Sequence, residues 1–323
     1  MASEMRMRFV FCAVHGLALG FVAAITSGLV LAASDQNLTR CKGEGGPPPD
    51  QQITSCTSLI ESGSYRGQDL ARTYFSRAMG YLRKQDLDRA IKDLDSGLAL
   101  DPNNAAALYN RAIGYEAKGD SDRALNDYDA ALQLKPDYLK ALTNRGAIYF
   151  EKGDYDRAIE DQNRVIALNP ADATPLINRG RSYAEKGDYD RAIGDFDQAV
   201  RLNELRFAPP SGYALYYRGL ALLAKGEDDR AIGDLNQAIV MAPRNPLIFE
   251  GLGVAFLRQG QLDQAIADFD EALKLRPTLA SALYGRGLAK LKKGENASGE
   301  ADVSAAKAIN PNIVDEFARY GLS

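Results

Sequence analysis

The sequence predicts an all-α solenoid in which one helix hairpin is repeated along the chain. The first observation behind this prediction is that prolines recur every 34 residues, in two arrays: Pro102, Pro136 and Pro170, then Pro243, Pro277 and Pro311. The second is that small residues recur at fixed places within this period, and the third is that large apolar residues alternate with them. A repeat array builds one continuous core from contacts between neighbours, so length alone sets no domain count.

Seven units follow from this register. The two arrays are 73 residues apart, which is two periods plus five, so one unit lacks its proline near Glu204 and residues 207–211 are an insertion. The units are 71–104, 105–138, 139–172, 173–206, 212–245, 246–279 and 280–313. Positions 1–14 of each unit are expected to form a first helix and positions 17–30 a second one, packed against the first.

Small residues at positions 8 and 20 allow the two helices of a unit to approach closely. Position 8 is Ala78, Ala112, Gly146, Gly180, Gly219, Gly253 and Gly287, and position 20 is Ala90, Ala124, Ala158, Ala192, Ala231, Ala265 and Gly299. Large groups at positions 11 and 24 fill the space between, as with Tyr149 and Phe196. A glycine at position 15 closes the first helix in six units, and the proline at position 32 stops the second.

This pattern resembles the tetratricopeptide repeat (TPR) family over about three quarters of the chain. The resemblance implies a right-handed TPR superhelix of about seven hairpins with N- and C-terminal capping helices. Two positions depart from the family. Position 4 is mostly Leu, and position 7 is Arg in six units instead of Leu.

Residues 1–33 read as a signal peptide or a signal anchor. Arg6 and Arg8 precede an uncharged apolar run from Phe9 to Ala33, which ends in small residues. The run is also long enough to span a bilayer, so cleavage and retention as a membrane anchor through residues 9–33 both remain open. Either outcome exports the repeats, to the periplasm or out of the cell.

Between the leader and the repeats we expect a flexible linker at 34–50, because this stretch is rich in glycine, proline and polar residues. A capping helix is expected at 51–70 and another at 314–323. Cys41 and Cys56 are an even pair beyond the leader, which predicts a disulfide in an oxidising compartment. The alternative is two free thiols.

Positions 2, 5, 9 and 12 of the first helix share one face, which in TPR proteins lines the concave groove. Apolar and aromatic residues on this face predict that it binds a protein partner, and Asn at position 6 matches a family preference. The partner-binding candidates are Phe75, Met79, Tyr109, Asn110, Ile113, Asn144, Phe150, Ile177, Asn178, Tyr213, Tyr216, Leu220 and Tyr284, with Val254 and Leu288 on the same face. The alternative is that curvature buries part of the stripe. A carboxylate clamp is disfavoured, since only Lys140 and Arg181 offer basic groups there.

A recurring arginine and aspartate pair predicts a bidentate ion pair between the two helices of each hairpin. The pairs join positions 7 and 23: Arg77 and Asp93, Arg111 and Asp127, Arg145 and Asp161, Arg179 and Asp195, Arg218 and Asp234, Arg286 and Asp302. The sixth unit breaks the series, with Leu252 opposite Asp268. The alternative is an arginine ladder open to anions.

The sequence offers little for catalysis. The only histidine, His15, lies in the leader, and no nucleotide-binding, metal-binding or cofactor motif is present. The net charge of −4 gives no electrostatic reason to expect nucleic acid. We therefore expect a non-catalytic scaffold that binds a partner peptide or helix in cell-envelope assembly, as in the secreted bacterial TPR proteins it resembles. The alternatives are a self-associating structural protein and an enzyme with its site at 203–211.

Overall fold

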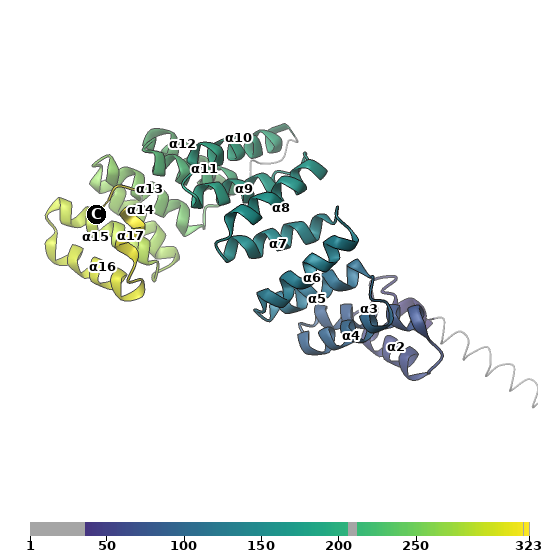
Figure 1. Ribbon diagram of the computed structural model, residues 1–323. Helices are drawn as coiled ribbons and strands as arrows, with labels where there is room; N and C mark the ends of the chain where they lie inside the picture. The colour runs from purple at the N-terminus through teal and green to yellow at the C-terminus, as the bar shows by residue number, and fades with distance from the viewer. Residues whose placement is uncertain (1–35, 206–211, 319, 323) are drawn as a thin grey trace, which may run out of the picture. The chain divides into compact units, whose positions relative to one another are not determined.

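The computed structural model describes residues 36–205, 212–318 and 320–322, and side chains at 203–205 are not described. Helices and the turns between them account for these ranges (Figure 1). The expectations for residues 1–33 and for the insertion at 207–211 lie outside them. Within the ranges given, no helix is long and apolar enough to cross a membrane. The chain divides into two compact units, residues 1–141 and 142–323, and each is described by itself.

The first unit holds two complete hairpins behind a capping helix. Its helices are α2 (Pro49–Glu61), α3 (Gly67–Arg83), α4 (Leu87–Leu100), α5 (Ala105–Ala117) and α6 (Ser121–Leu134). Helix α3 packs on α4 and α5 packs on α6, while α2 packs on α3 and α4 on α5. This is the stacking order that a repeat array predicts.

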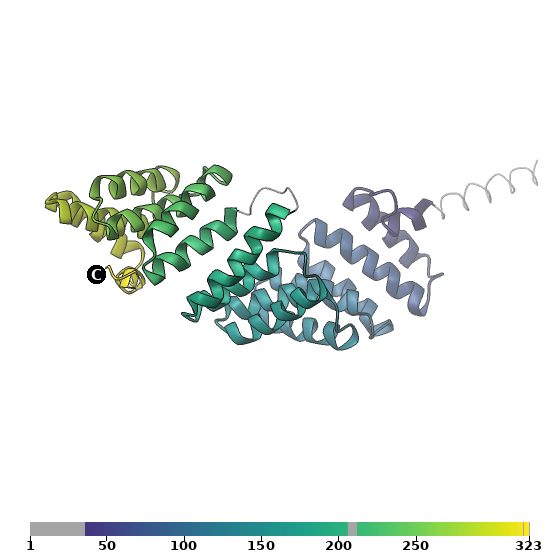
Figure 2. The ribbon, with the colours of Figure 1, turned by 90° about the horizontal axis from the view of Figure 1, so that it is seen from above.

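The second unit continues the same pattern to the C-terminus. Helix α7 (Leu139–Glu151) spans the division, and the helices after it are α8 (Tyr155–Leu168), α9 (Thr174–Glu185), α10 (Tyr189–Leu205), α11 (Gly212–Lys225), α12 (Asp228–Met241), α13 (Pro246–Arg258), α14 (Leu262–Leu275), α15 (Ala280–Lys293), α16 (Asn296–Ile309) and α17 (Ile313–Ala318). Figure 2 shows the hairpins α13–α14 and α15–α16 side by side, joined by contacts between α14 and α15. The predicted fold class is confirmed.

The N-terminal segment differs from the prediction. Residues 36–41 are helical, where a flexible linker was expected, and α2 begins at Pro49 and ends at Glu61, short of the predicted 51–70. The cause is apolar packing that composition does not reveal, because Cys41, Cys56 and Leu59 form a buried cluster with Leu38 and Tyr65 against it. The linker prediction is therefore wrong for residues 36–41.

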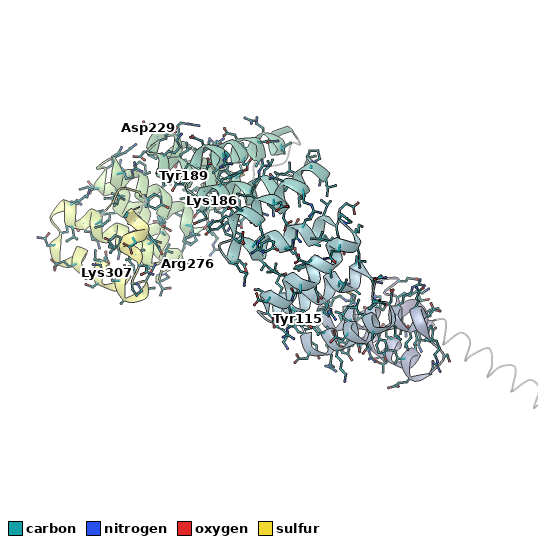
Figure 3. All side chains as sticks on the ribbon, viewed as in Figure 1. Tyr115, Lys186, Tyr189, Asp229, Arg276 and Lys307 are labelled. Atoms are coloured by element: carbon teal, nitrogen blue, oxygen red, sulfur yellow. A yellow bond between two sulfur atoms is a disulfide. The ribbon has the colours of Figure 1, made fainter. Side chains whose placement is uncertain are left out.

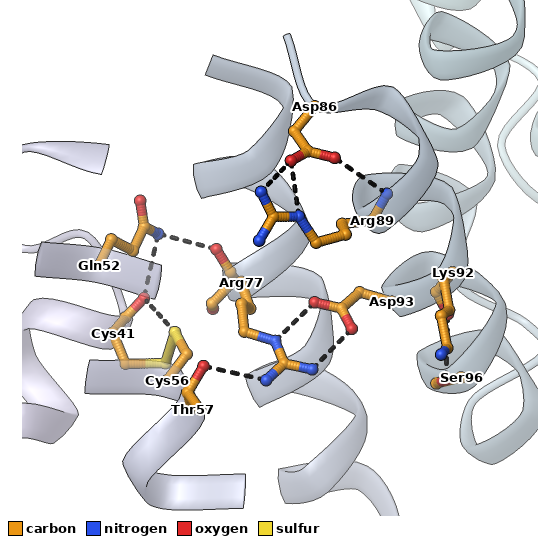
Figure 4. A network of polar contacts seen from close by, with 11 residues as sticks. Cys41, Gln52, Cys56, Thr57, Arg77, Asp86, Arg89, Lys92, Asp93 and Ser96 are labelled. Atoms are coloured by element: carbon orange, nitrogen blue, oxygen red, sulfur yellow. Dashed lines mark hydrogen bonds and ion pairs between the residues drawn. A yellow bond between two sulfur atoms is a disulfide. The ribbon is translucent and has the colours of Figure 1, made fainter. Parts of the chain in front are cut away.

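The two cysteines lie in this cluster, and the structure places the Cys41 and Cys56 sulfurs 2.11 Å apart as a bonded pair. The carbonyl of Cys41 also accepts a hydrogen bond from Gln52 Nε2 at 3.1 Å, and the same Nε2 donates to the Ser76 carbonyl at 3.0 Å (Figure 4). The segment before α2 is thus joined to α2 and, through Gln52, to α3.

We expect this pair to form in the mature protein and to stabilise the N-terminal cap. Closing a loop of about 15 residues contributes about 3 kcal/mol in the chain-entropy model. Intact mass under non-reducing conditions should be 2 Da below that of the reduced chain, roughly the mass of two hydrogens. Changing both Cys41 and Cys56 to Ser should lower the urea midpoint of the wild-type chain as much as reduction does. Equal midpoints for oxidised, reduced and Ser forms would show that the pair contributes nothing.

In the first four repeats the second helix begins at an aspartate cap, at position 16 of the unit. The Oδ1 atom of Asp86 accepts from the backbone N–H of Arg89, and Asp120, Asp154 and Asp188 repeat the contact. A carboxylate there satisfies an orphan N–H group of the first turn. Aspartates at position 18, two residues later, form ion pairs with lysines of the next hairpin in four repeats, as Asp88 does with Lys118.

The first helix of a hairpin ends in the left-handed conformation that glycine favours. Gly119 has φ 77°, and the other glycines of position 15 share this geometry. The first repeat has Gln85 there instead, with φ 59°. It is the one residue other than glycine with positive φ among those described.

The core is built where a large side chain of one helix meets a glycine of another. Phe269 of α14 is fully buried between α13 and α15. A Cβ atom added at Gly253 would lie 2.7 Å from the ring, and one added at Gly285 would lie 2.2 Å from it. Neither position admits a side chain without moving the ring, so glycine sets the spacing of these helices.

Candidate functional site

The arginine and aspartate pairs are formed as predicted, and they build each hairpin. In all six, Nε and Nη2 of the arginine donate to the two oxygens of the aspartate at 2.6–2.9 Å. The arginine side chains are only 16–23% exposed. A ladder open to anions is therefore contradicted, because the guanidinium forks are already occupied by carboxylates.

In five of these arginines, Nη1 bonds a residue of the preceding helix pair or cap. Nη1 of Arg111 reaches Asp95 at 2.6 Å, and Nη1 of Arg179 reaches Asn163 at 2.6 Å. In the first repeat the acceptor is Thr57 of α2, at 3.0 Å (Figure 4). Helix α2 thus takes the place that the second helix of a preceding repeat would have.

Lysine and aspartate pairs form a second, exposed ladder along the turns. Figure 3 labels Lys186 at the end of α9, whose ammonium pairs with Asp156 of the preceding repeat. Lys118 with Asp88, Lys225 with Asp190 and Lys293 with Asp263 follow the same rule. Because the aspartates are 80–85% exposed, water and salt screen these pairs and each adds little to stability.

In the first unit, the predicted groove residues lie on α3 and α5. Met79 is 37% exposed, and Phe75, Asn110 and Ile113 are half-buried. The ring of Tyr109 packs between two further tyrosines, 5.8 Å from Tyr128 and 5.0 Å from Tyr138. The face is apolar and partly open, but much of its aromatic surface is used in packing between neighbouring helices.

In the second unit, the open part of the groove face centres on Arg181 of α9. Its guanidinium carbon lies 4.5 Å from the centroid of the Phe150 ring and 5.0 Å from that of Tyr217. These three residues line a cavity of about 220 Å³ together with Leu220. Tyr189, labelled in Figure 3, and Tyr320 also line it. A cation between two aromatic faces beside aliphatic surface can anchor a peptide through cation–π and apolar contacts.

Other predicted groove residues are in the core. Tyr216 is 8% exposed, Tyr284 is 4% exposed and Val254 is 1% exposed, so the expectation that this whole face is open is wrong for them. Burial raises the pKa of the Tyr216 hydroxyl. The cover over Tyr284 is the C-terminal helix α17, because Phe317 packs edge-on against its ring with 4.9 Å between centroids.

The remaining candidates are spread over three places. Tyr213 is 65% exposed and lines a separate cavity of about 710 Å³ with Met241 and Pro243, so it is not joined to Tyr216. Asn144, Ile177 and Leu288 are half-buried. Asn178 lines a small pocket of about 140 Å³ on α9.

The sequence pattern did not identify Tyr217, Tyr320 or Gln162 as site residues. Tyr217 follows a groove position directly and turns its ring onto Phe196, with 6.1 Å between centroids. Tyr320 lies beyond the last repeat, so the repeat period cannot predict where its side chain packs. Gln162 could have been found, because it stands at position 24, where other repeats have Leu, Tyr or Phe.

Sequence comparison places this chain among known repeats. Profiles of the tetratricopeptide repeat match residues 75–113, 109–173 and 177–246, and a TPR repeat profile matches residues 255–294. These ranges cover well over half of the sequence. Among curated proteins, none matches it.

Solved structures with a similar fold include the following three proteins. A tetratricopeptide repeat protein from Parabacteroides merdae is 24% identical, with a TM-score of 0.64 over 78% of this chain and 99% of that one. PilW, a type IV pilus biogenesis factor, is 20% identical, with a TM-score of 0.57 over 64% of this chain and 94% of its own. MamA from Desulfovibrio magneticus RS-1, from residue 41 onward, is 22% identical, with a TM-score of 0.50 over 54% and 96%. At these identities the likeness shows the fold alone.

Proposed function

Since the chain belongs to the tetratricopeptide repeat family, we propose that it is a non-catalytic scaffold that binds a peptide or helix of a partner protein on the open groove face of its second unit. The observation that carries this proposal is the cavity at Arg181, where a cation is flanked by Phe150 and Tyr217 and bordered by Leu220. Half-buried aromatic and arginine side chains are the residues that most often dominate binding energy at protein interfaces.

The proposed binding surface is smaller than the stripe that the repeat pattern suggested. It consists of Phe150, Ile177, Arg181, Tyr217 and Leu220, all from α7, α9 and α11. Tyr216 and Tyr284 are excluded because they are buried under the chain itself. A peptide lying along helix faces uses such side chains as spaced anchors, while its polar groups stay hydrated at the rim.

We propose the cell envelope as the place of action. The leader-like residues 1–33 and the bonded pair of Cys41 and Cys56 support this location, because structural disulfides persist in oxidising compartments. We do not propose an enzyme, since the sequence beyond residue 33 contains no histidine and no recognised catalytic motif. Cell fractionation with intact-mass analysis separates a cleaved leader from a retained anchor.

The proposal is tested by crosslinking capture from envelope extracts with wild-type chain and the variant Arg181→Glu. Reversing this charge between two rings removes the cation–π contacts and repels any acidic group of the partner. We expect capture of a specific partner to fall at least tenfold, about 1.4 kcal/mol. The matched control is Arg201→Glu on α10, the same change at an exposed arginine, which should capture as wild type does.

Two outcomes would contradict the proposal. If Arg181→Glu and Arg201→Glu reduce capture equally, the effect is one of net charge and the cavity is not the site. If the chain recovers only itself, and both variants do so as well, self-association becomes the better account. Circular dichroism melts of both variants should match wild type closely, because substitutions at half-open surface positions change stability by about 0.5 kcal/mol or less.

A further inference from the structure

The third repeat differs from the others at one buried position. Position 24 holds an apolar or aromatic residue such as Leu94, Phe196 or Leu235 in other repeats, but it is Gln162 in this one. Gln162 is 2% exposed, and its Oε1 atom is buried without a hydrogen-bond partner among the residues described. Buried polar atoms in folded proteins are nearly always paired, so this acceptor is left for a group other than the described residues of the chain.

Gln162 lines a pocket that opens beside the Arg181 cavity. The pocket has a volume of about 140 Å³, and Phe150, Asn178, Arg181 and Ser182 line it as well. Gly146 keeps it open, because a Cβ atom there would lie 2.6 Å from Gln162 Nε2. The volume exceeds that of one water by several-fold, so a small side-chain group fits.

The polar atoms of the pocket select the chemistry of an occupant. A purely apolar group would leave Gln162 Oε1 unpaired, and a carboxylate would face that oxygen as a second acceptor. An ammonium group would lie next to the Arg181 guanidinium, and the Glu151 carboxylate that also lines the pocket is exposed to water, so it offsets this repulsion only weakly. A neutral group that both donates and accepts avoids all three conflicts, because it can donate to Gln162 and accept from Arg181 or Asn178.

Resting on the proposed function, we propose that this pocket binds the primary carboxamide of an asparagine or glutamine side chain of the partner. The carboxamide N–H donates to Gln162 Oε1, and its carbonyl accepts from the polar groups at the rim. The match holds if the oxygen and nitrogen of Gln162 are exchanged, since a carboxamide carries both a donor and an acceptor. Ser182 supports the wall, because its hydroxyl donates to the Asn178 carbonyl at 3.1 Å.

The test uses acetamide as the probe and the exported chain beginning at Ser34. Proton–nitrogen correlation spectra should show saturable shifts of the Gln162 and Asn178 side-chain amides. N,N-dimethylacetamide, which lacks N–H donors, and acetate should bind at least tenfold more weakly, because a site built for hydrogen bonds rejects analogues that cannot form them.

The matched variant is Gln162→Leu, since Leu occupies this position in the first and fifth repeats. It should melt higher than wild type and lose the saturable shift; Gln162→Met replaces it if the Leu variant does not fold. Shifts that are linear in acetamide concentration, or equal in wild type and variant, would overturn the proposal. Capture that still depends on Arg181 while acetamide shifts do not saturate would refute the carboxamide pocket and leave the proposed function standing. Saturable acetamide binding with capture that no longer depends on Arg181 would instead refute the partner site.

Discussion

Arg179→Leu is expected to lower the free energy of unfolding by about 3–5 kcal/mol, because it leaves a buried carboxylate without its partner. Asp195 is 6% exposed, and its two oxygens accept from Arg179 at 2.6 and 2.8 Å. The same guanidinium also bonds Asn163 of the preceding repeat at 2.6 Å, so its loss separates neighbours as well as helices. Urea unfolding with hydrogen exchange of α9 and α10 measures the effect, because repeats open locally.

Two controls separate the buried pair from charge in general. The double variant with Leu at both positions 179 and 195 should recover most of the loss, since replacing a buried ion pair by apolar residues is often neutral. Arg191→Leu removes an exposed pair with Asp188, whose side chains are 61% and 31% exposed, and should destabilise the chain far less than Arg179→Leu does. If Arg179→Leu costs no more than Arg191→Leu, the ladder does not determine hairpin packing.

The second large effect is expected at Asp268, where the ladder is broken. Leu252 stands in place of an arginine, and burial, with the nearby charge of Glu271, raises the pKa of the Asp268 carboxyl to about 6. The folded state therefore favours the protonated form. The contribution of protonated Asp268 to the free energy of unfolding is fully present below the pKa of about 4 that this group has in the unfolded chain. It is lost as pH rises through 6, the pKa in the folded state. At pH 8, the free energy of unfolding of Asp268→Asn should be higher than that of wild type by about 2 kcal/mol.

The pH dependence of this difference is the decisive readout. Well below pH 4 the carboxyl is protonated in both the folded and the unfolded state, so wild type and Asp268→Asn should be equally stable there. The same change at Asp234, which pairs with Arg218 at 2.6 Å, should destabilise the chain at pH 8 instead. A difference between Asp268→Asn and wild type that stays constant from pH 4 to pH 8 would show that the raised pKa has no part in it.

A second carboxyl group with a raised pKa is that of Glu250 on α13. Burial, with the charge of Glu316 of α17 adding to it, raises the pKa of Glu250 to about 7, although a hydrogen bond with Ser281 opposes the shift. As for Asp268, the raised pKa means that the folded state favours the protonated carboxyl, so packing in this region also weakens as pH rises through 7. Wild-type melts should therefore be compared with variants at each pH separately.

The repeat period predicted the hairpins and the ion-pair ladder, because both depend on contacts that recur at fixed positions. Arg77 and Asp93 could be paired from the sequence alone, since the two helices of one hairpin must meet. The period could not place residues outside the repeats. Residues 36–41 looked like part of a linker because glycines and prolines follow Cys41 closely, and their order comes from burial against α2.

The candidate site was predicted only in part for the same reason. Tyr216 and Tyr284 occupy groove positions, but whether they are open depends on where the tail packs, and Phe317 covers Tyr284. Gln162 is visible in the sequence as an exception at position 24, yet its meaning depends on a pocket that only coordinates reveal. Irregular positions in a regular array are therefore the first residues to inspect for function.

The measurement that tests the central claim most directly is the crosslinking capture with wild-type, Arg181→Glu and Arg201→Glu chains in parallel. The account predicts one specific partner in the wild-type and Arg201→Glu samples, reduced at least tenfold in the Arg181→Glu sample. Equal recovery of that partner by all three chains would contradict the claim that the Arg181 cavity is the binding site of this scaffold.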